Sequence, residues 1–268
     1  MLISVVVTTY NRPDALRAVL DGLAAQTDRD FEVIVADDGS REDTRVLVED
    51  TAPDFPVQLD HVWQEDKGFR AGAARNRAAE RARGGYLVFL DGDCIPRVDF
   101  IARHRALSEP GWMVAGHRVL LSEKVTAQTL RDRLPLQQRS RSEWSAAQRR
   151  GDINRTLPLA TLALGPLRKI AARRWQRIRT CNLGVWMNDF RRVRGFDETF
   201  EGWGFEDSDL AVRLLNAGVR RKEGAFATGV LHLWHRENDR KNEGRNWELL
   251  QERIRSGETL PVRGLQVR

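Results

Sequence analysis

The sequence predicts an α/β protein with a mostly parallel sheet flanked by helices. Two observations carry this prediction: apolar, β-branched runs alternate with helical segments from the N-terminus onward, and polar residues follow three of the first four predicted strands. Strands and helices alternating at this pace imply crossover connections that leave neighbouring strands parallel. At 268 residues the chain can bury a sizeable core in one such domain.

The predicted elements follow one another closely. Residues 3–9 form a β-branched strand, and Pro13 opens a helix whose apolar face includes Leu16 and Leu23. The elements expected next are a strand at 31–36, a short helix at 42–49, a strand at 57–63, an alanine-rich helix at 70–83 and a strand at 86–90.

Polar side chains gather where these strands end. In chain order they are Thr8, Tyr10 and Arg12 at the end of the first strand, Asp37 and Asp38 after the second, and Asp91 and Asp93 after the fourth. Ligands of open α/β sheets bind at the carboxyl ends of the strands. This edge therefore predicts a nucleotide-diphosphate cleft, with a carboxylate for a base or ribose and carboxylates that hold a metal against the phosphates.

The triplet Asp91-Gly92-Asp93 is the most informative feature of that edge. Carboxylate oxygens suit hard cations such as Mg²⁺ or Mn²⁺, and the glycine gives the backbone freedom to turn. Taken alone, an Asp-Gly pair at a strand end also fits an ordinary turn.

A basic loop precedes the alanine-rich helix. Lys67, Arg70 and Arg75 offer cations to a diphosphate, and Arg75 is the strongest candidate.

The middle of the chain is basic and hard to interpret. The formal charge of +6 comes from 44 Lys and Arg against 38 Asp and Glu, and much of the excess lies within residues 131–179. There an apolar stretch at 157–164 leads into a basic helical stretch at 168–175. Three interpretations remain open: a helix on an anionic membrane surface, a flexible flap, or an ordinary packed helix pair.

No apolar stretch approaches the roughly 18 residues that span a bilayer, and the N-terminus lacks the pattern of a signal peptide. Two cysteines are too few for a disulfide framework. Both observations favour a cytoplasmic location, with peripheral contact at the inner face of a membrane left open.

A second polar constellation occurs late in the chain. Trp203 stands between two glycines, Glu206 and Asp207 follow it, and a helix is expected to begin near Ser208. An aromatic face and adjacent carboxylates suit a sugar, because the ring covers its apolar side and a carboxylate can deprotonate a hydroxyl. Helix capping by Asp207 or Ser208 is the structural alternative.

Two histidines, His232 and His235, follow three residues apart. A His-x-x-His pair is often incidental, and no third histidine lies nearby, which argues against a closed zinc site. A mixed site completed by Asp93 is the better prediction.

Together these motifs resemble nucleotide-sugar glycosyltransferases of the GT-A (Rossmann-like) fold, specifically glycosyltransferase family 2 with a C-terminal galactosyltransferase-like segment. Chondroitin polymerases and β-1,4-galactosyltransferases are similar. The resemblance covers residues 2–110 and 180–240. It implies a single domain with a nucleotide-sugar-binding half at 1–110, a helical, basic or flexible insertion at 111–179, and an acceptor-binding and catalytic half at 180–268.

The resemblance also implies an activity: metal-dependent, inverting transfer from a UDP-sugar to a hydroxyl of a saccharide or glycolipid, in bacterial cell-surface polysaccharide synthesis. It implies a role for each residue, and these roles are as follows: Asp207 is the base; Trp203 and Glu206 position the acceptor; Thr8, Tyr10, Arg12, Asp37, Asp38, Lys67, Arg75 and Asp91 bind the nucleotide sugar; Asp93, His235 and also His232 hold Mn²⁺ or Mg²⁺. The sequence has Phe205 where a glycine is common, which leaves the acceptor open.

Two other functions fit parts of the sequence. A strand running into Asp-x-Asp also occurs in haloacid-dehalogenase-type phosphatases, with Asp91 as nucleophile, although that motif normally lies near the start of its domain. The arginine-rich middle and eight tryptophans suggest a basic nucleic-acid-binding module, but an acidic cleft would repel phosphates. We therefore expect no nucleic-acid partner.

Overall fold

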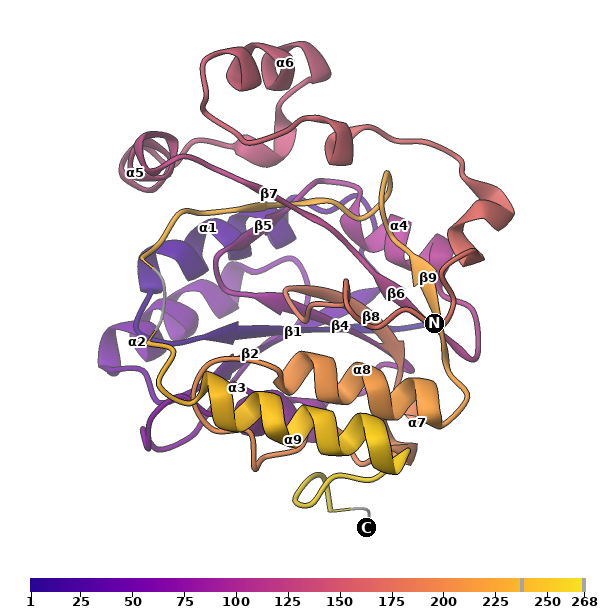
Figure 1. Ribbon diagram of the computed structural model, residues 1–268. Coiled ribbons are helices and arrows are strands. Elements are labelled where there is room, and N and C mark those ends of the chain that lie inside the picture. The colour runs from indigo at the N-terminus through magenta and orange to yellow at the C-terminus, as the bar shows by residue number, and fades with distance from the viewer. Residues whose placement is uncertain (237–238, 267–268) are drawn as a thin grey trace.

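The computed structural model describes residues 1–236 and 239–266, and it shows a large sheet with helices on both faces (Figure 1). Within those residues the large sheet has seven strands. In spatial order they are β3 (Leu59–Trp63), β2 (Phe31–Asp37), β1 (Ile3–Thr9), β4 (Tyr86–Asp91), β8 (Asn182–Trp186), β6 (Trp112–Ala115) and β9 (Arg220–Glu223). β1 is parallel to β2 and β4, whereas β8 is antiparallel to β4 and β6. The predicted α/β class with a mostly parallel sheet is confirmed.

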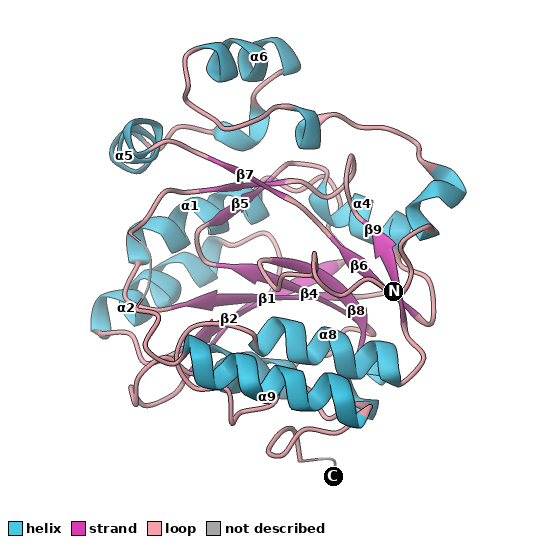
Figure 2. Ribbon diagram, in the orientation of Figure 1, coloured by secondary structure: helices cyan, strands magenta, loops and turns pink. Residues whose placement is uncertain are grey.

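Helices cover both faces of this sheet (Figure 2). On one face lie α1 (Pro13–Ala24), α2 (Glu42–Thr51) and α4 (Phe100–Leu107), and on the other lie α3 (Ala71–Arg81), α7 (Met187–Arg192) and α8 (Glu206–Asn216), with α9 (Glu243–Ser256) packed on α8. The alternation of side chains along β1 explains the two cores. Ile3, Val5 and Val7 enter the core on the α1 face, and Val6 enters the core on the α3 face.

The elements predicted in the first half of the chain are present, with small differences at their ends. Pro13 begins α1, as its fixed φ and missing N–H favour. β3 begins at Leu59, two residues later than expected, and α3 ends at Arg81.

A smaller sheet was not predicted. It contains β5 (Cys94–Pro96), β10 (Val230–His232) and β7 (Arg118–Leu120), in that spatial order. β10 runs antiparallel to β5, with His232 opposite Cys94, and the Leu233 N–H donates to the Asp93 carbonyl at 2.8 Å. This pairing fixes the late histidine segment beside the early acidic turn.

The segment after β7 lies on one side of the large sheet, at the top of Figure 1. Its helical elements are α5 (Glu123–Asp132), η2 (Leu136–Gln138), α6 (Arg141–Arg149), η3 (Leu157–Leu159) and η4 (Gly165–Lys169). The expected basic helix at residues 168–175 is wrong, because η4 ends at Lys169 and turns follow it. In the described part of the chain, no helix is long and apolar enough to cross a membrane.

Candidate functional site

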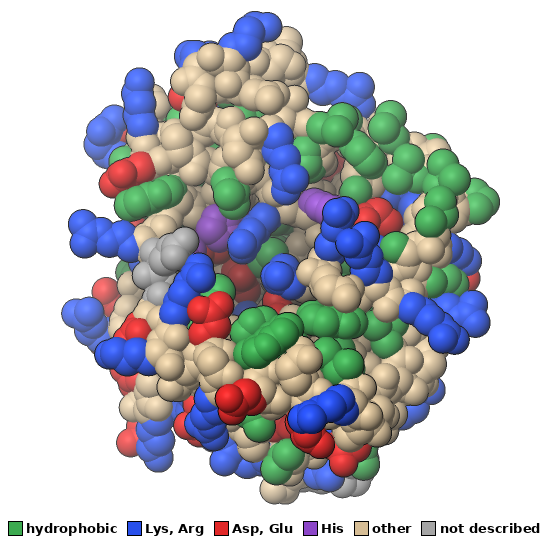
Figure 3. Space-filling model, viewed as in Figure 1, with side chains coloured by type: hydrophobic (Ala, Val, Ile, Leu, Met, Phe, Trp, Pro, Cys, Tyr) green, Lys and Arg blue, Asp and Glu red, His purple; other side chains and the backbone are tan. Residues whose placement is uncertain are grey.

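The predicted acidic turn and the tryptophan-acid segment line one cavity of about 910 Å³ at the carboxyl ends of β1 and β4. Figure 3 shows a hollow near the middle of this face, with histidine, acidic and basic side chains around it. The expected site residues that line the cavity are Thr8, Tyr10, Arg12, Asp38, Arg75, Asp91, Asp93, Trp203, Glu206, Asp207, His232 and His235. Segments more than a hundred residues apart therefore meet at one site.

The acidic turn is held close to the end of β1. The Gly92 N–H donates to the Thr8 carbonyl at 2.7 Å, and a Cβ on Gly92 would lie 2.8 Å from the same oxygen. Gly92 is thus required for close backbone approach, and that approach places Asp91 and Asp93 at the mouth of the cavity.

Asp93 and the two histidines form the candidate metal centre. The Asp93 Oδ2 atom lies 3.3 Å from His235 Nε2 and 3.7 Å from His232 Nε2. Adjacent ligands at right angles on a metal with bonds of about 2.1 Å lie about 3.0 Å apart, so each histidine lies near the separation expected between it and Asp93 on one ion. Among the described residues, Asp93, Cys94 and His232 form a group whose ligand atoms all lie within 4.8 Å of one another. Carboxylate and imidazole donors suit Mn²⁺, and the carboxylate suits Mg²⁺.

Both histidines present a ring nitrogen to Asp93. The His235 Nδ1–H donates to the Arg236 carbonyl at 2.7 Å, so Nε2 is the atom that faces Asp93. Burial lowers the pKa of His232, against the opposing charge of Asp93, and so favours the neutral ring. The Cys94 thiol lies beside this group, where it donates to Asp93 Oδ1 at 3.4 Å, and burial raises its pKa.

Arg75 joins three parts of the site. Its guanidinium donates to Thr8 Oγ1 at 2.9 Å, pairs with Asp91 Oδ1 at 3.0 Å and pairs with Glu206 Oε1 at 3.1 Å, and only 5% of its side chain is exposed. The guanidinium thus positions carboxylates from β4 and α8 against each other.

The two carboxylates that Arg75 holds have unusual protonation equilibria. Burial raises the pKa of Glu206, the neighbouring Asp207 raises it further, and Arg75 opposes both effects. Burial likewise raises the pKa of Asp91, with Arg75 opposing and Asp93 adding to the rise. Loss of Arg75 would remove the positive charge that stabilises the ionised form of both carboxylates.

The tryptophan-acid segment turns sharply into α8. Gly204 has φ of +108° and Phe205 has φ of +71°, and Phe205 is the N-cap of the helix. No side chain caps this N-terminus, so the capping alternative for Asp207 and Ser208 is wrong, and α8 begins at Glu206 rather than near Ser208. Asp207 instead faces the cavity, with Arg179 Nε at 3.8 Å from its Oδ2.

Aromatic and basic side chains surround this turn. The Arg240 guanidinium stacks over the Trp203 ring at 4.7 Å, and the Phe205 ring packs against Trp247 at a centroid distance of 5.2 Å. This side of the cavity thus combines flat apolar faces with cations.

Asp37 and Lys67 do not line this cavity. Asp37 is fully buried beside the sheet, where it accepts from the Ser40 N–H at 2.7 Å and lies 2.9 Å from His61 Nε2. Lys67 is exposed and pairs with Glu65 at 2.8 Å. Asp38 does face the cavity and accepts from the Arg70 N–H at 2.6 Å.

Residues that the sequence did not single out also line the cavity, notably Arg118, Arg179 and Trp234. Arg118 reaches it from β7, opposite Val230 in the small sheet. No local pattern marks Arg118, because its position depends on the pairing of strands only three residues long.

Comparisons with known proteins identify the family of the chain. The model of glycosyl transferase family 2 matches residues 4–168, and that of the N-terminal domain of galactosyltransferase matches residues 170–236. Validoxylamine A glucosyltransferase of Streptomyces hygroscopicus subsp. jinggangensis is 34% identical over 231 residues, covering 81% of this chain and 52% of that protein. Chondroitin synthase of Escherichia coli is 28% identical over 249 residues, covering 84% of this chain and 34% of that protein. The chain spans about half the length of these curated relatives, or less.

Two solved structures show a similar fold. The mannosyltransferase PcManGT from Pyrobaculum calidifontis, in complex with GDP-Man and Mn²⁺, has a TM-score of 0.60 at 20% identity, over 94% of this chain and 61% of that one. S. aureus TarS 1–349 in complex with UDP-GlcNAc has a TM-score of 0.61 at 16% identity, over 93% of this chain and 65% of that one. These likenesses confirm the GT-A fold, and the family matches confirm the predicted resemblance.

Proposed function

The chain belongs to glycosyltransferase family 2, and we propose that it transfers a sugar, with inversion, from a UDP-sugar to a hydroxyl of a saccharide or glycolipid. One observation carries this proposal: Asp207 and Asp93 line the same cavity, with a carboxylate for the acceptor on one side and a metal-binding set on the other. Cell-surface polysaccharide synthesis in a bacterium is the setting that we propose.

Asp207 is the proposed base. It lies at the start of α8, its side chain is 14% exposed, and it faces the cavity rather than capping the helix. From there its carboxylate takes the proton of the acceptor hydroxyl as that oxygen attacks the anomeric carbon from the side opposite the leaving diphosphate. Trp203 offers the acceptor a ring face, and Glu206, held by Arg75, accepts a hydrogen bond from a second hydroxyl.

The donor half of the cavity is proposed to bind the nucleotide. Asp38 and Thr8, at the ends of β2 and β1, face the cavity where the base and ribose would lie, with Tyr10 and Arg12 at its rim. Asp91, fixed by Arg75, accepts from the ribose or from a metal-bound water. Of the expected donor-binding residues, Asp37 and Lys67 have no place in this proposal, because they lie outside the cavity lining.

Asp93, His232 and His235 would hold Mn²⁺ or Mg²⁺. A divalent ion held by these residues would supply positive charge to neutralise the departing diphosphate. Arg118 lies on the same side of the cavity and adds a fixed positive charge. One structural neighbour is in complex with UDP-GlcNAc and the other with GDP-Man and Mn²⁺, so a panel of nucleotide sugars is the direct test of the donor.

A panel of UDP-, GDP- and dTDP-sugars, assayed for nucleotide release with Mn²⁺, with Mg²⁺ and with EDTA, tests the proposal. We expect release from a UDP-sugar that EDTA abolishes, and we expect Asp93→Ala to weaken metal-dependent UDP binding by at least about tenfold. Asp43→Ala, at an exposed position of α2, is the matched control and should leave binding unchanged. The absence of nucleotide release from every sugar in the panel would contradict the proposal.

The two alternative functions have lost their support. Family membership does not fit a haloacid-dehalogenase-type phosphatase or a nucleic-acid-binding module. Asp91 is also engaged by Arg75 at 3.0 Å, which makes it a poor nucleophile.

A further inference from the structure

An exposed apolar segment lies away from the proposed active site. Leu157, Leu162, Leu167 and Ile170, here called the apolar rim, are 65%, 48%, 61% and 78% exposed. In Figure 3 hydrophobic side chains crowd the upper right of the molecule, where Figure 1 shows the segment that carries η4. Single exposed apolar residues are common on proteins, but several gathered in one segment mark an interaction surface.

The burial pattern around η4 is the reverse of that expected for a surface in water. Arg168 is 6% exposed, whereas its neighbour Leu167 and the nearby Ile170 face outward. The Arg168 guanidinium donates to the Leu162 carbonyl at 2.9 Å and to the carbonyls of Glu223 and Ala225 at 2.8 and 2.6 Å. Polar bonds beneath the segment therefore hold its apolar side chains outside.

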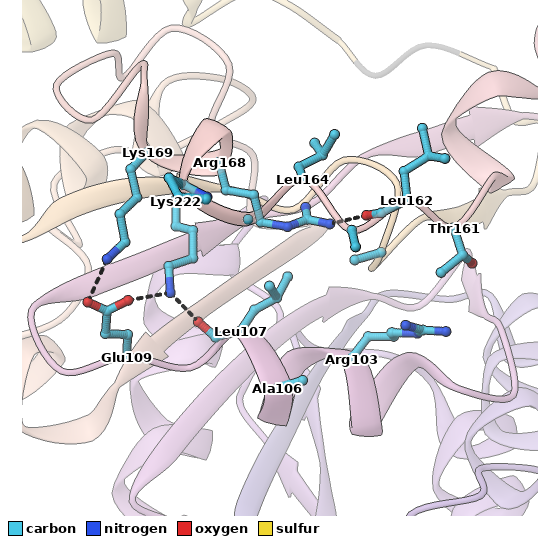
Figure 4. Close-up of a pocket in the computed structure, with 14 residues that line it drawn as sticks. Arg103, Ala106, Leu107, Glu109, Thr161, Leu162, Leu164, Arg168, Lys169 and Lys222 are labelled. Atoms are coloured by element: carbon cyan, nitrogen blue, oxygen red, sulfur yellow. Dashed lines mark hydrogen bonds and ion pairs between the residues drawn. The ribbon is translucent and has the colours of Figure 1, made fainter.

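Figure 4 shows how the segment stands over a cavity of about 680 Å³. Lys169 and Lys222 both pair with Glu109 beneath it, at 2.8 and 2.7 Å. The Lys169 pair anchors the segment from below, and Lys222 of β9 holds Glu109 in place, while Leu167 and Ile170 are 61% and 78% exposed. The exposed conformation is thus fixed by the fold.

The stretch of chain that carries the apolar rim contains cations and no acidic residue. Residues 153–188 contain no Asp or Glu, and their seven cations are Arg155, Arg168, Lys169, Arg173, Arg174, Arg177 and Arg179. Arg173, Arg174 and Arg177 are exposed and form no ion pair within residues 1–236 and 239–266. Apolar side chains flanked by unpaired arginines complement an anionic lipid surface, where the apolar groups enter the headgroup layer and the cations meet phosphates.

We propose that the apolar rim, together with Arg173, Arg174 and Arg177, docks the protein on an anionic bilayer. A nucleic acid would use the arginines but gains nothing from exposed leucine and isoleucine side chains, so lipid explains both observations. This docking is independent of the transfer reaction proposed above, because none of these residues lines the catalytic cavity.

Co-sedimentation with vesicles tests the proposal. The protein is mixed with vesicles of phosphatidylcholine alone or of phosphatidylcholine with phosphatidylglycerol. We expect binding to the anionic vesicles to exceed binding to the neutral ones by at least about tenfold, and to weaken with added salt. Leu167→Ser/Ile170→Ser and Arg173→Gln/Arg174→Gln should each reduce it about tenfold or more. Val262→Ser is the matched control, because Val262 is also 78% exposed but lies in the C-terminal segment.

Three results would overturn the proposal. One is the absence of vesicle binding, and another is unchanged binding by Leu167→Ser/Ile170→Ser. The third is self-association that this variant abolishes without any lipid binding, which would make a second copy of the chain the occupant. Metal-dependent UDP binding, measured on the same variants, should stay normal, so a failure here is distinguishable from a failure of the proposed transferase activity.

Discussion

Replacing Arg75 by methionine would remove the cation that links β1, β4 and α8. Asp91 and Glu206, at 3.0 and 3.1 Å from the guanidinium, would then lose their partner. Breaking a buried ion pair costs about 3–5 kcal/mol. We expect about 3 kcal/mol at pH 8, the lower end, because the Asp91 side chain keeps 30% of its surface exposed while that of Glu206 keeps 12%.

The loss should depend on pH in a defined direction. Burial already raises the pKa of both carboxyl groups, and loss of Arg75 raises the pKa of each further above its value in the unfolded chain. Ionisation of these groups in the folded state is then unfavourable, so the variant loses stability as pH rises through the raised pKa values and regains it as they protonate.

Urea unfolding of Arg75→Met and wild type at pH 5, 6.5 and 8 measures both effects. The destabilisation should be largest at pH 8 and clearly smaller at pH 5. Arg45→Met, which removes exposed ion pairs on α2, is the control and should show no measurable change. A loss below about 1 kcal/mol, or one that is equal at all three pH values, would refute the reasoning.

Two further substitutions test the backbone of the site. Gly92→Ala places a methyl group 2.8 Å from the Thr8 carbonyl, so we expect a loss of about 1–3 kcal/mol and a raised KM for the donor; an unchanged Tm and KM would contradict the close approach. Phe205 has φ of +71°, so Phe205→Gly should be more stable than Phe205→Ala by about 1 kcal/mol, the reverse of the usual order in helices, because both variants lose the ring contact with Trp247 and only alanine keeps the strain. Thermal unfolding of the two variants compares them directly, and equal or greater stability of Phe205→Ala would count against a strained N-cap.

The first half of the fold could be predicted because its elements are long and periodic. The β-branched run of β1 and the proline at the start of α1 are local signals, and the structure follows them closely. Strands β5, β7 and β10 have three residues each, too few to show a period, so the small sheet that brings His232 to Cys94 had no local signature.

Some details of the site depended on geometry that residue types do not encode. Asp37 and Asp38 look equivalent in the sequence, but Asp37 is the last residue of β2 and Asp38 lies in the bend that follows it. Asp37 turns inward to Ser40 and His61, and only Asp38 reaches the cavity. The turn at Phe205 could not be predicted either. Its backbone is left-handed, a conformation that sequence patterns assign to glycine rather than to phenylalanine.

Comparing Asp207→Asn with Asp209→Asn tests the central claim most directly. Asp209 is fully buried and pairs with Arg213 at 2.7 Å and Arg253 at 2.9 Å, so it is a structural carboxylate two residues from the proposed base. With the UDP-sugar found in the panel and an acceptor, Asp207→Asn should keep its stability and its metal-dependent UDP binding while turnover falls by about 10²–10⁴-fold. Asp209→Asn should be less stable than the wild type, but the molecules that remain folded should still turn over the substrate. Near-normal turnover by Asp207→Asn would show that another group removes the proton and would contradict the mechanism.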